Sequence, residues 1–263
     1  MMAVQDRDGP LTDQAAQIAL GRDLIRHAHA ICVLTGAGIS TESGIPDFRG
    51  PNGLWTKDPG AERLSTLAHY LQDREARVAA WRRRALSKDP PPRPNAGHLA
   101  LVDLEAQGRL ELLVTQNIDG LHHLAGNSRE RLVELHGSLR EQVCLTCQRR
   151  GPMEEVLERV RHGDADPHCQ ACGGILKSAA ISFGQGLSAA EWDRAQTGAG
   201  TCDLFLAVGT RLEVFPAAEL PAMALAAGTP LVVVNQEPTR FDRRARAVIR
   251  APIGQILGEL LAP

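Results

Sequence analysis

Four cysteines have the spacing of a metal site. Cys144 and Cys147 form one Cys-x-x-Cys pair, and Cys169 and Cys172 form a second pair further along the chain. Each pair presents two thiolates from a tight turn, and four thiolates complete the tetrahedral shell of a structural Zn²⁺ ion. A redox-active dithiol is the alternative, but that chemistry uses one pair beside a βαβ unit. The spacing therefore predicts a zinc site.

A glycine-containing turn is a candidate phosphate site. Residues 36–40, with the sequence GAGIS, follow a short apolar run and precede polar residues. Glycines let a backbone approach a pyrophosphate closely, and N–H groups at the start of a helix can bind it. Thr41 stands where the dinucleotide-binding fingerprint has its third glycine, and no acidic residue ends a second strand about 20 positions later. On these residues alone, an ordinary strand–helix turn is an equally good interpretation.

Two polar clusters complete the candidate chemistry. His136 lies in the segment ELHGS, just before the cysteine pairs, where two lobes would meet and ligands commonly bind. The segment TQNIDGLH begins at the carboxyl end of an expected strand, the edge at which α/β proteins bind ligands. Its residues Gln116, Asn117 and Asp119 offer amides and a carboxylate, although they also favour a plain turn. Local chemistry alone indicates a nucleotide-binding α/β protein with a zinc knuckle.

Alternating apolar runs and helical stretches must position these groups. Continuous apolar runs, typical of parallel strands covered on both faces, predict strands in ICVLT and at Leu110–Thr115, Ala179–Phe183, Leu204–Val208 and Leu231–Val234. Helices are expected from about Thr12 to Ala28, at Asn95–Gln107 and at Ser188–Gln196. This alternation predicts an α/β fold with a Rossmann-like, doubly wound parallel sheet.

Two stretches interrupt the alternation and predict a small lobe. Residues 51–94 contain an Arg-rich helical middle and a proline run that would act as a stiff return linker, and residues 139–176 carry the paired cysteines. The expected organisation is a discontinuous Rossmann-like domain of residues 1–50, 95–138 and 177–263. The helical insertion 51–94 and the zinc-binding module 139–176 would form the small lobe.

Composition limits the class of protein. The chain of 263 residues is 43% hydrophobic, enough for a globular core, and its net charge of −2 suggests no nucleic acid or anionic membrane as partner. The longest apolar run, Ala222–Val234, is too short to span a bilayer and is broken by Gly228 and Pro230. The first residues carry charges without an apolar core, unlike a secretory signal. Paired cysteines then suggest metal rather than disulfides, and we expect a cytoplasmic protein.

Together the motifs resemble the bacterial-type sirtuins, a family that uses NAD to remove acyl groups from protein lysines. Residues 36–50, GAGISTESGIPDFRG, are similar to the family's cofactor-loop motif along their whole length, and TQNIDGLH, ELHGS and the four cysteines follow in the family's order. The segments VGTRLEVFPAAEL and VVVNQEPT resemble the later cofactor motifs. The likeness covers the chain from about residue 15 to residue 260, and it implies NAD and Zn²⁺ as cofactors.

The resemblance implies a role for each matching residue. The NAD pyrophosphate would be bound by Gly36, Ala37 and Gly38, and the mobile loop that closes on NAD would contain Asp47, Phe48 and Arg49. The nicotinamide and its ribose would be bound by Gln116, Asn117, Ile118 and Asp119. The adenosine end would be bound by Gly209, Thr210, Arg211, Asn235 and Glu237. His136 would be the general base, with Asn117 as the second catalytic residue. An acyl-lysine protein would bind as an extended peptide that pairs with a strand beginning at Phe183 and Gly184.

The implied reaction converts NAD and acyl-lysine to nicotinamide, O-acyl-ADP-ribose and free lysine. His136 would deprotonate a ribose hydroxyl, which suits an imidazole whose pKa lies near working pH. Transfer of ADP-ribose to protein and NAD hydrolysis are the alternatives on the same pocket. A non-catalytic, zinc-stabilised nucleotide-binding module is disfavoured because the base and the nicotinamide-pocket residues are all present.

The chain departs from the family pattern in the peptide and acyl regions. Residues 178–182 and Gln185 stand where the family commonly has Pro-Asp-Val-Val before Phe-Gly-Glu, which leaves the peptide preference open. Arg211 replaces the serine of Gly-Thr-Ser-Leu and either contacts a phosphate or faces solvent. Sirtuins that prefer acidic acyl groups share a Tyr-x-x-Arg pair. In this chain Tyr70 is the only tyrosine, and Asp73 stands three residues after it, where the pair has its arginine. The neighbouring run Arg82-Arg83-Arg84 could turn at most one residue into the pocket, so we expect uncharged acyl groups to be preferred over succinyl.

Overall fold

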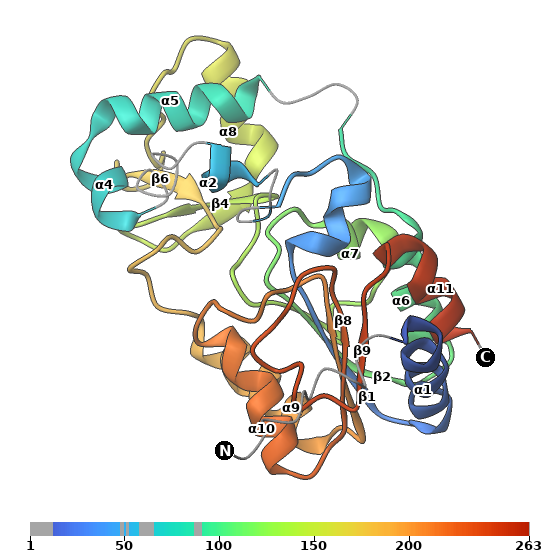
Figure 1. Cartoon of the computed structure of the whole chain (residues 1–263). Helices are drawn as coiled ribbons and strands as arrows, with labels where there is room; N and C mark the ends of the chain where they lie inside the picture. Colours follow the sequence, from blue (N-terminus) through green and yellow to red (C-terminus); the bar gives the residue numbers. More distant parts are fainter. Residues whose placement is uncertain (1–12, 48–49, 51–52, 58–65, 87–90, 263) are drawn as a thin grey trace, which may run out of the picture.

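The structure is a computed structural model that describes residues 13–47, 50, 53–57, 66–86 and 91–262. Figure 1 shows a larger lobe built on one sheet and a smaller lobe that holds residues 66–86 and 141–178. Two residues predicted for the NAD loop, Phe48 and Arg49, lie outside the described residues. Within the part of the chain that is described, no helix combines the length and the apolar character needed to cross a membrane.

Six parallel strands form the sheet of the larger lobe, in the order β3-β2-β1-β7-β8-β9. They are β1 (Ile31–Thr35), β2 (Leu110–Thr115), β3 (Leu132–Glu134), β7 (Leu204–Val208), β8 (Leu231–Val234) and β9 (Ala247–Ile249). The chain starts at β1 in the middle of the sheet, winds outward to β3, and returns to the other side of β1 with β7. This order confirms the predicted doubly wound sheet. Its switch point lies between β1 and β7, where such folds bind ligands.

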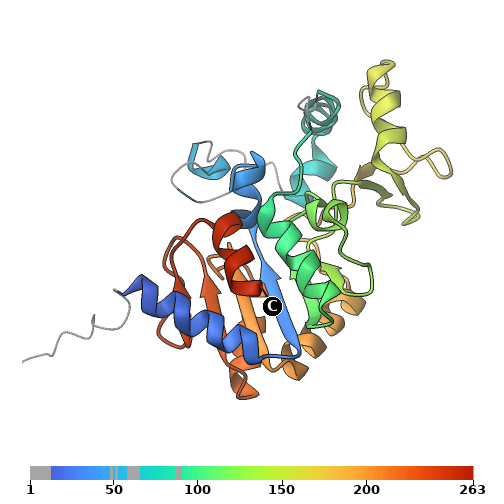
Figure 2. The same cartoon turned by 90° about the vertical axis from the view of Figure 1, so that its right-hand side faces the viewer.

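Helices cover both faces of the sheet, as Figure 2 shows in a side view. One face packs against α1 (Gln14–His27), α6 (Ala96–Ala106) and α11 (Ile253–Leu261). The other face packs against α9 (Ala189–Thr201) and α10 (Leu220–Ala226). Every residue of β1, β7 and β8 is buried, which explains why these strands are apolar without alternation. The short elements η1, α7 and η2 connect the strands and span Ala37–Ser43, Leu121–Ala125 and Ala217–Glu219.

The predicted helices form, and their ends have identifiable causes. Asn95 caps α6 with its side chain and Gly108 ends the turn after it at a φ of 72°. Ser188 caps α9 as expected, but that helix continues to Thr201, five residues beyond the predicted end at Gln196. Gly198 lies inside this extension against Leu112, where an added Cβ would come within 2.8 Å of the leucine side chain. Close packing on β2 therefore outweighs the low helix propensity of glycine.

The prediction of a strand at Ala179–Phe183 is wrong. The strand in this region is β6 (Leu176–Ser178), which pairs antiparallel with β4 (Glu141–Cys144) in a separate sheet. Residues 179–183 form a loop, whose backbone is bonded to the ELHGS segment: the Ile181 N–H donates to the His136 carbonyl at 2.7 Å. The two segments lie so close that a Cβ on Gly137 would come within 2.2 Å of the Ala179 carbonyl oxygen. An apolar run here reflects close contact between loops rather than a sheet.

The small lobe combines both insertions around one apolar cluster. Its antiparallel sheet β5-β4-β6 includes β5 (Arg150–Pro152), and its helices are α4 (Leu67–Gln72), α5 (Arg74–Ala85) and α8 (Met153–Arg161). The short helix α2 (Leu54–Lys57) precedes them in the chain and lies apart from α5 and α8 in Figure 2. Trp81 of α5 is fully buried among Met153, Leu157 and Leu176. A bidentate ion pair joins Arg77 to Asp166, with 2.9 Å between Arg77 Nη2 and Asp166 Oδ2. The helical insertion and the cysteine region are therefore packed as one unit.

Candidate active site

A cavity of about 800 Å³ opens at the switch point between β1 and β7. It receives residues from the loops after β1, β2, β3, β7 and β8, which explains why motifs distant in sequence share one site. The predicted residues that line it are Gly36, Ala37, Gly38, Asp47, Gln116, Asn117, Ile118, His136, Phe183, Gly184, Gly209, Thr210, Arg211, Asn235 and Glu237. Asp119 is the described exception, since it does not reach the cavity wall.

The glycine turn is locked to the end of β7. The N–H groups of Gly36 and Gly38 donate to the carbonyls of Val208 and Gly209, at 3.0 and 2.9 Å. A Cβ on Gly38 would come within 2.7 Å of the Gly209 Cα, and Gly209 itself has a φ of 61°. The glycines therefore let two backbones touch. Because two of the turn's N–H groups are already used, any phosphate at this turn must rely on other donors as well.

Asn117 and Asp119 are held by one serine. The Asn117 amide Nδ2 donates to the Gly36 carbonyl at 3.1 Å and to Ser40 Oγ at 3.2 Å, while Ser40 Oγ donates to Asp119 Oδ2 at 2.7 Å. Asp119 also accepts from the Leu121 N–H, at 2.9 Å, which ties it to the start of α7. Asp119 thus supports the cavity from behind, and it does so by fixing Ser40 and, through it, Asn117.

The His136 ring has a defined tautomer. Its Nδ1 lies 3.0 Å from the Gln116 carbonyl oxygen, which can only accept, so Nδ1 carries the proton and Nε2 is left as a free base. Burial lowers the pKa of His136, and the hydrogen bond to the Gln116 backbone opposes this shift. Gln116 in turn donates from Nε2 to Thr210 Oγ1 at 2.9 Å. The base and the far wall of the cavity are therefore linked through one glutamine.

A buried polar chain beneath Asn117 was not identified from the sequence. Thr35 Oγ1 donates to Thr115 Oγ1 at 2.8 Å and lies 3.0 Å from His122 Nε2, and Thr115 Oγ1 accepts the Asn117 N–H at 3.1 Å. The His122 ring lies 4.8 Å from that of His98, and burial lowers the pKa of His122 to about 3. His98 is fully buried on α6, and its Nδ1 lies 3.1 Å from Asn95 Oδ1. His122 ends the TQNIDGLH motif, and only burial distinguishes it from a surface histidine.

Charged side chains shape the end of the cavity near β8. Arg211 pairs with Glu237, with 3.0 Å between Nη1 and Oε2, and it also pairs with Glu213. Arg250 donates from Nη1 to the carbonyls of Asn235 and Glu237, at 2.6 and 2.9 Å. Arg250 was not predicted, because its function depends on backbone carbonyls that no motif reveals. Arg211 is therefore paired with two carboxylates while its side chain stays partly exposed.

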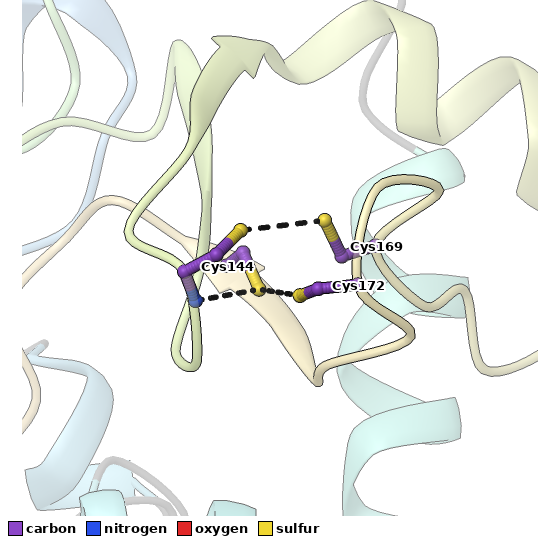
Figure 3. A group of neighbouring side chains, drawn as sticks. Cys144, Cys169 and Cys172 are labelled. Atoms are coloured by element: carbon purple, nitrogen blue, oxygen red, sulfur yellow. Dashed lines mark hydrogen bonds between the residues drawn. The ribbon is translucent and has the colours of Figure 1, made fainter.

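The four paired cysteines meet in the small lobe. Their sulfurs all lie within 4.8 Å of one another; Cys144 Sγ is 3.5 Å from Cys172 Sγ, and Cys147 Sγ is 3.8 Å from Cys169 Sγ. Figure 3 shows the sulfurs facing each other from two turns. Sulfurs about 2.3 Å from a central zinc ion would be roughly 3.8 Å apart, so the cluster fits Zn²⁺. With four thiolates and no open position, the site is structural.

Comparison with known families decides the relationship. The model of the Sir2 family matches residues 36–216, which include the glycine turn, the TQNIDGLH and ELHGS segments and all four zinc-site cysteines. The chain belongs to the Sir2 family, the sirtuins. The NAD-dependent protein deacetylase 2 of Streptomyces coelicolor is 49% identical to this sirtuin over 231 residues, which are 88% of this chain and 96% of that protein.

Solved sirtuin structures share the fold. One, from a study of the mechanism and regulation of Sir2 enzymes, gives a TM-score of 0.83 at 36% identity and covers 94% of this sirtuin and 96% of its own chain. Another is a Sir2 complex with a p53 peptide and NAD⁺, with a TM-score of 0.80 at 30% identity and 91% and 95% coverage. NAD is accordingly the cofactor of this sirtuin, and the four-cysteine cluster of the small lobe is compatible with zinc.

This sirtuin differs from the family pattern around a buried lysine. Lys177 Nζ donates to the Ser178 carbonyl at 3.0 Å, to the Ala180 carbonyl, and to Gln185 Oε1 at 3.3 Å. All three acceptors are neutral, because Gln185 occupies the place of the family's glutamate. Burial, with Arg84 and Arg150 nearby, lowers the pKa of Lys177 to about 8. The ammonium group holds the loop at 178–185 in its bent course along the cavity.

Proposed function

We propose that this sirtuin removes acetyl and other uncharged acyl groups from protein lysines in an NAD-dependent reaction. Its relatives are named as NAD-dependent protein deacetylases and deacylases, and the products are nicotinamide, O-acyl-ADP-ribose and free lysine. One observation carries this function: the free Nε2 of His136 belongs to the same cavity as the glycine turn and the loop at Phe183. A base, a nucleotide site and a peptide site are therefore within one space.

Each wall of the cavity has a proposed role. Gly36–Gly38 would lie along the pyrophosphate and Asp47 in the loop that closes on NAD. Gln116–Ile118 would lie at the nicotinamide and its ribose, and Gly209–Arg211 with Asn235 and Glu237 at the adenosine. Bound NAD supplies an electrophilic ribose carbon with nicotinamide as leaving group. His136 Nε2 then accepts a proton from a hydroxyl within the cavity, while its Nδ1–H donates to the Gln116 carbonyl and keeps the ring in place. Asn117, fixed by Ser40, would orient the nicotinamide end.

The peptide would enter beside Phe183 and Gly184. Phe183 forms an isolated parallel bridge with Thr66, and its carbonyl accepts the Leu67 N–H at 3.0 Å, so backbone pairing of this loop with an extended segment has a precedent within the fold. Phe183 is 40% exposed, which is unusual for a phenylalanine and suits a surface that a substrate covers. An extended peptide would add main-chain hydrogen bonds here by β-augmentation.

Mass spectrometry separates deacylation from its alternatives. An acetyl-lysine peptide incubated with NAD should lose its acetyl group while O-acetyl-ADP-ribose and nicotinamide appear. Transfer of ADP-ribose would instead increase the mass of the protein acceptor, and NAD hydrolysis would release ADP-ribose without any change in the peptide. If neither the peptide nor NAD changes, the protein is a nucleotide-binding module without enzyme activity.

The proposed acyl preference rests on the described residues of the helical insertion, none of which places a cation at the cavity wall. The Tyr70 hydroxyl donates to the Leu176 carbonyl at 2.8 Å, and Asp73 caps α5, so neither is arranged to bind a carboxylate. Arg84 alone of the arginine run turns inward, where its Nη2 donates to Ser178 Oγ at 3.2 Å, and it does not line the cavity. Measured kcat/KM should be higher for acetyl- and butyryl-lysine than for succinyl-lysine. Arg84→Gln is the first variant to make if succinyl-lysine is the best substrate.

Two broader assignments are also proposals. We propose that residues 1–50, 95–138 and 177–263 form the NAD-binding domain and that residues 51–94 and 139–176 form the small lobe; the support is that the described residues form two separate sheets. The boundary after residue 176 needs a correction, because Lys177 and Ser178 belong to β6 and pair with β4 in the small-lobe sheet. We also propose a cytoplasmic location, because thiolates kept for a metal ion need a reducing compartment. Fractionation of the source cells, with zinc content measured in each fraction, tests the second assignment.

A further inference from the structure

An exposed aromatic ring stands at the rim of the cavity. Phe215 lies on the loop between β7 and η2, lines the cavity, and is 57% exposed. Its neighbours in sequence after Pro216, Ala217 and Ala218, are fully or almost fully buried, so the loop itself is well packed. An apolar ring held in water by a rigid loop is a surface suited to contact with a partner.

A guanidinium group is fixed against this ring. The Arg240 Cζ atom lies 4.8 Å from the ring centre of Phe215 and 4.8 Å from that of Phe241, so the cation is sandwiched between two rings. Arg240 Nη2 also donates to the Ala218 carbonyl at 2.8 Å. Arg244 continues the stack, with its Cζ 5.8 Å from the Phe241 ring. Arg240 is therefore held in place before any partner arrives.

The cations around Phe215 lack carboxylate partners. Arg240, Arg243 and Arg244, here called the arginine patch, are exposed, and no carboxylate among the described residues is within ion-pairing distance of them. The carboxylate between them in sequence, Asp242, is engaged by Arg250. On the cavity side, Glu213 is engaged by Arg211. The patch thus presents a local positive charge on a chain whose net charge is −2.

We propose that the arginine patch and Phe215 bind acidic residues that flank the acyl-lysine of the protein substrate. This inference rests on the proposed deacylase function, because the patch is reached from the cavity through Phe215. Arginine presents several N–H donors that match a carboxylate, and ring contacts with the aliphatic part of the flanking chain add to this. Charge complementarity at the rim of a site raises the rate of encounter and selects among sequences.

The test compares matched peptides. Acetyl-lysine peptides carrying three glutamates, three glutamines or three lysines, placed either before or after the acetyl-lysine, are assayed for kcat/KM. On the side that meets Phe215, the acidic peptide should be preferred over the neutral peptide by about tenfold, as three exposed ion pairs would give. The preference should shrink in high salt, because exposed pairs are screened. The other side of the acetyl-lysine should show little effect.

Variants assign the preference to the patch. Arg240→Gln/Arg243→Gln/Arg244→Gln should bring the ratio of acidic to neutral peptide close to one. Because Arg240 also supports two rings, Arg243→Gln/Arg244→Gln is the second variant, and Arg243→Glu/Arg244→Glu should prefer the lysine peptide. The matched control Arg22→Gln/Arg26→Gln/Arg129→Gln removes the same charge from exposed positions elsewhere and should retain the preference for the acidic peptide.

The outcomes separate this inference from the proposed function. If the wild-type protein deacetylates none of the peptides, the deacylase function fails. If it deacetylates all of them equally well, or if the control variants lose the preference as strongly as the patch variants do, only the arginine patch is wrongly assigned. Loss of duplex DNA binding in the patch variants, with unchanged peptide ratios, would also overturn the inference and assign the patch to a phosphate backbone.

Discussion

At the scale of residues, the site depends on a few side chains whose protonation is fixed by neighbours. The Nδ1–H of His136 donates to the Gln116 carbonyl, so whenever the imidazole is neutral its Nε2 carries the lone pair that can accept a proton. Asn117 is fixed by Ser40 and by the backbone of Gly36. These partners belong to three different loops, which explains why each motif alone was ambiguous in the sequence. Their meeting at one switch point removes the ambiguity.

Replacing His136 tests the base. His136→Ala should lower the rate of deacetylation by about 10²–10⁴-fold, the usual effect of losing a general base, while NAD still binds. The neutral ring is the active form, so activity should rise with pH through the His136 pKa and remain flat above it. Because burial lowers that pKa from the ordinary value near 6.5, the rising limb should lie on the acid side of about 6.5. Near-normal turnover of the variant, or a limb above pH 7, would contradict the assignment.

His122 should make stability depend on acid pH. Its pKa is about 3 in the folded protein, while the unfolded chain has the ordinary value near 6.5. As the pH falls below 6.5, His122 binds a proton in the unfolded state but stays neutral in the folded state, so the free energy of unfolding decreases. At pH 5.5 this costs about 1 kcal/mol relative to pH 7.5. His122→Phe lacks this pH-dependent loss. The difference in the free energy of unfolding between wild type and variant should therefore be smaller at pH 5.5 than at pH 7.5, by about the same amount.

Urea unfolding at the two pH values measures the gap. The matched control is His29→Gln, which removes an exposed histidine instead of the buried one. A constant gap for His122→Phe would show that His122 takes up its proton without unfolding the core.

At the scale of elements, the sequence predicted the strands that are formed by apolar runs, and it missed the features that depend on tertiary contacts. Strands β1, β7 and β8 were identified from unbroken apolar runs, and β2 from a run that only Glu111 interrupts. The three-residue strands β3 and β9 are too short to give such a signal. The run at 179–183 was wrongly predicted as a strand, because its apolar residues meet Gly137 and the His136 backbone rather than neighbouring strands. Similarly, Arg250 and His122 act through partners that only the fold brings near.

The loop at 178–185 offers a test at this scale. Gln185→Glu would give the buried Lys177 ammonium a charged acceptor in place of a neutral one, which should raise the Lys177 pKa and stabilise the protein by about 1 kcal/mol at pH 7. In the wild type the pKa is about 8, below the ordinary value, so stability should rise between pH 8 and pH 10 as the unfolded state binds more protons. That rise should be weaker in the variant.

Unfolding in urea at pH 7, 8 and 10 distinguishes this effect from a general change in charge. Gln72→Glu, on the exposed end of α4, adds the same charge without a buried partner and should change neither the stability nor its pH dependence by a comparable amount. If Gln185→Glu and Gln72→Glu change the stability equally, the change comes from the added charge and not from a contact with Lys177.

At the scale of the whole molecule, two cores of different kinds share one site. The larger lobe is stabilised by a sheet with buried residues on both faces, whereas the small lobe has a minor apolar cluster that includes Cys144 and Cys169 themselves. The small lobe reaches the base through the loop after β6, since the Ile181 N–H donates to the His136 carbonyl. Zinc should therefore matter for catalysis although it lies outside the cavity.

Removing zinc should unfold the small lobe and leave the larger one. Metal binding and folding are coupled in such small modules, and the minor apolar cluster alone buries too little surface to replace the ion. Treatment with a strong chelator, or Cys169→Ser, should therefore expose Trp81, which is fully buried with zinc-site residues in the same cluster. Its fluorescence should shift to longer wavelength, and Trp81→Phe identifies that signal. Deacetylation should be lost in parallel with bound zinc measured by elemental analysis, while the thermal transition of the six-stranded sheet persists. A metal-free protein that keeps Trp81 buried and remains active would show that the small lobe folds without its ion.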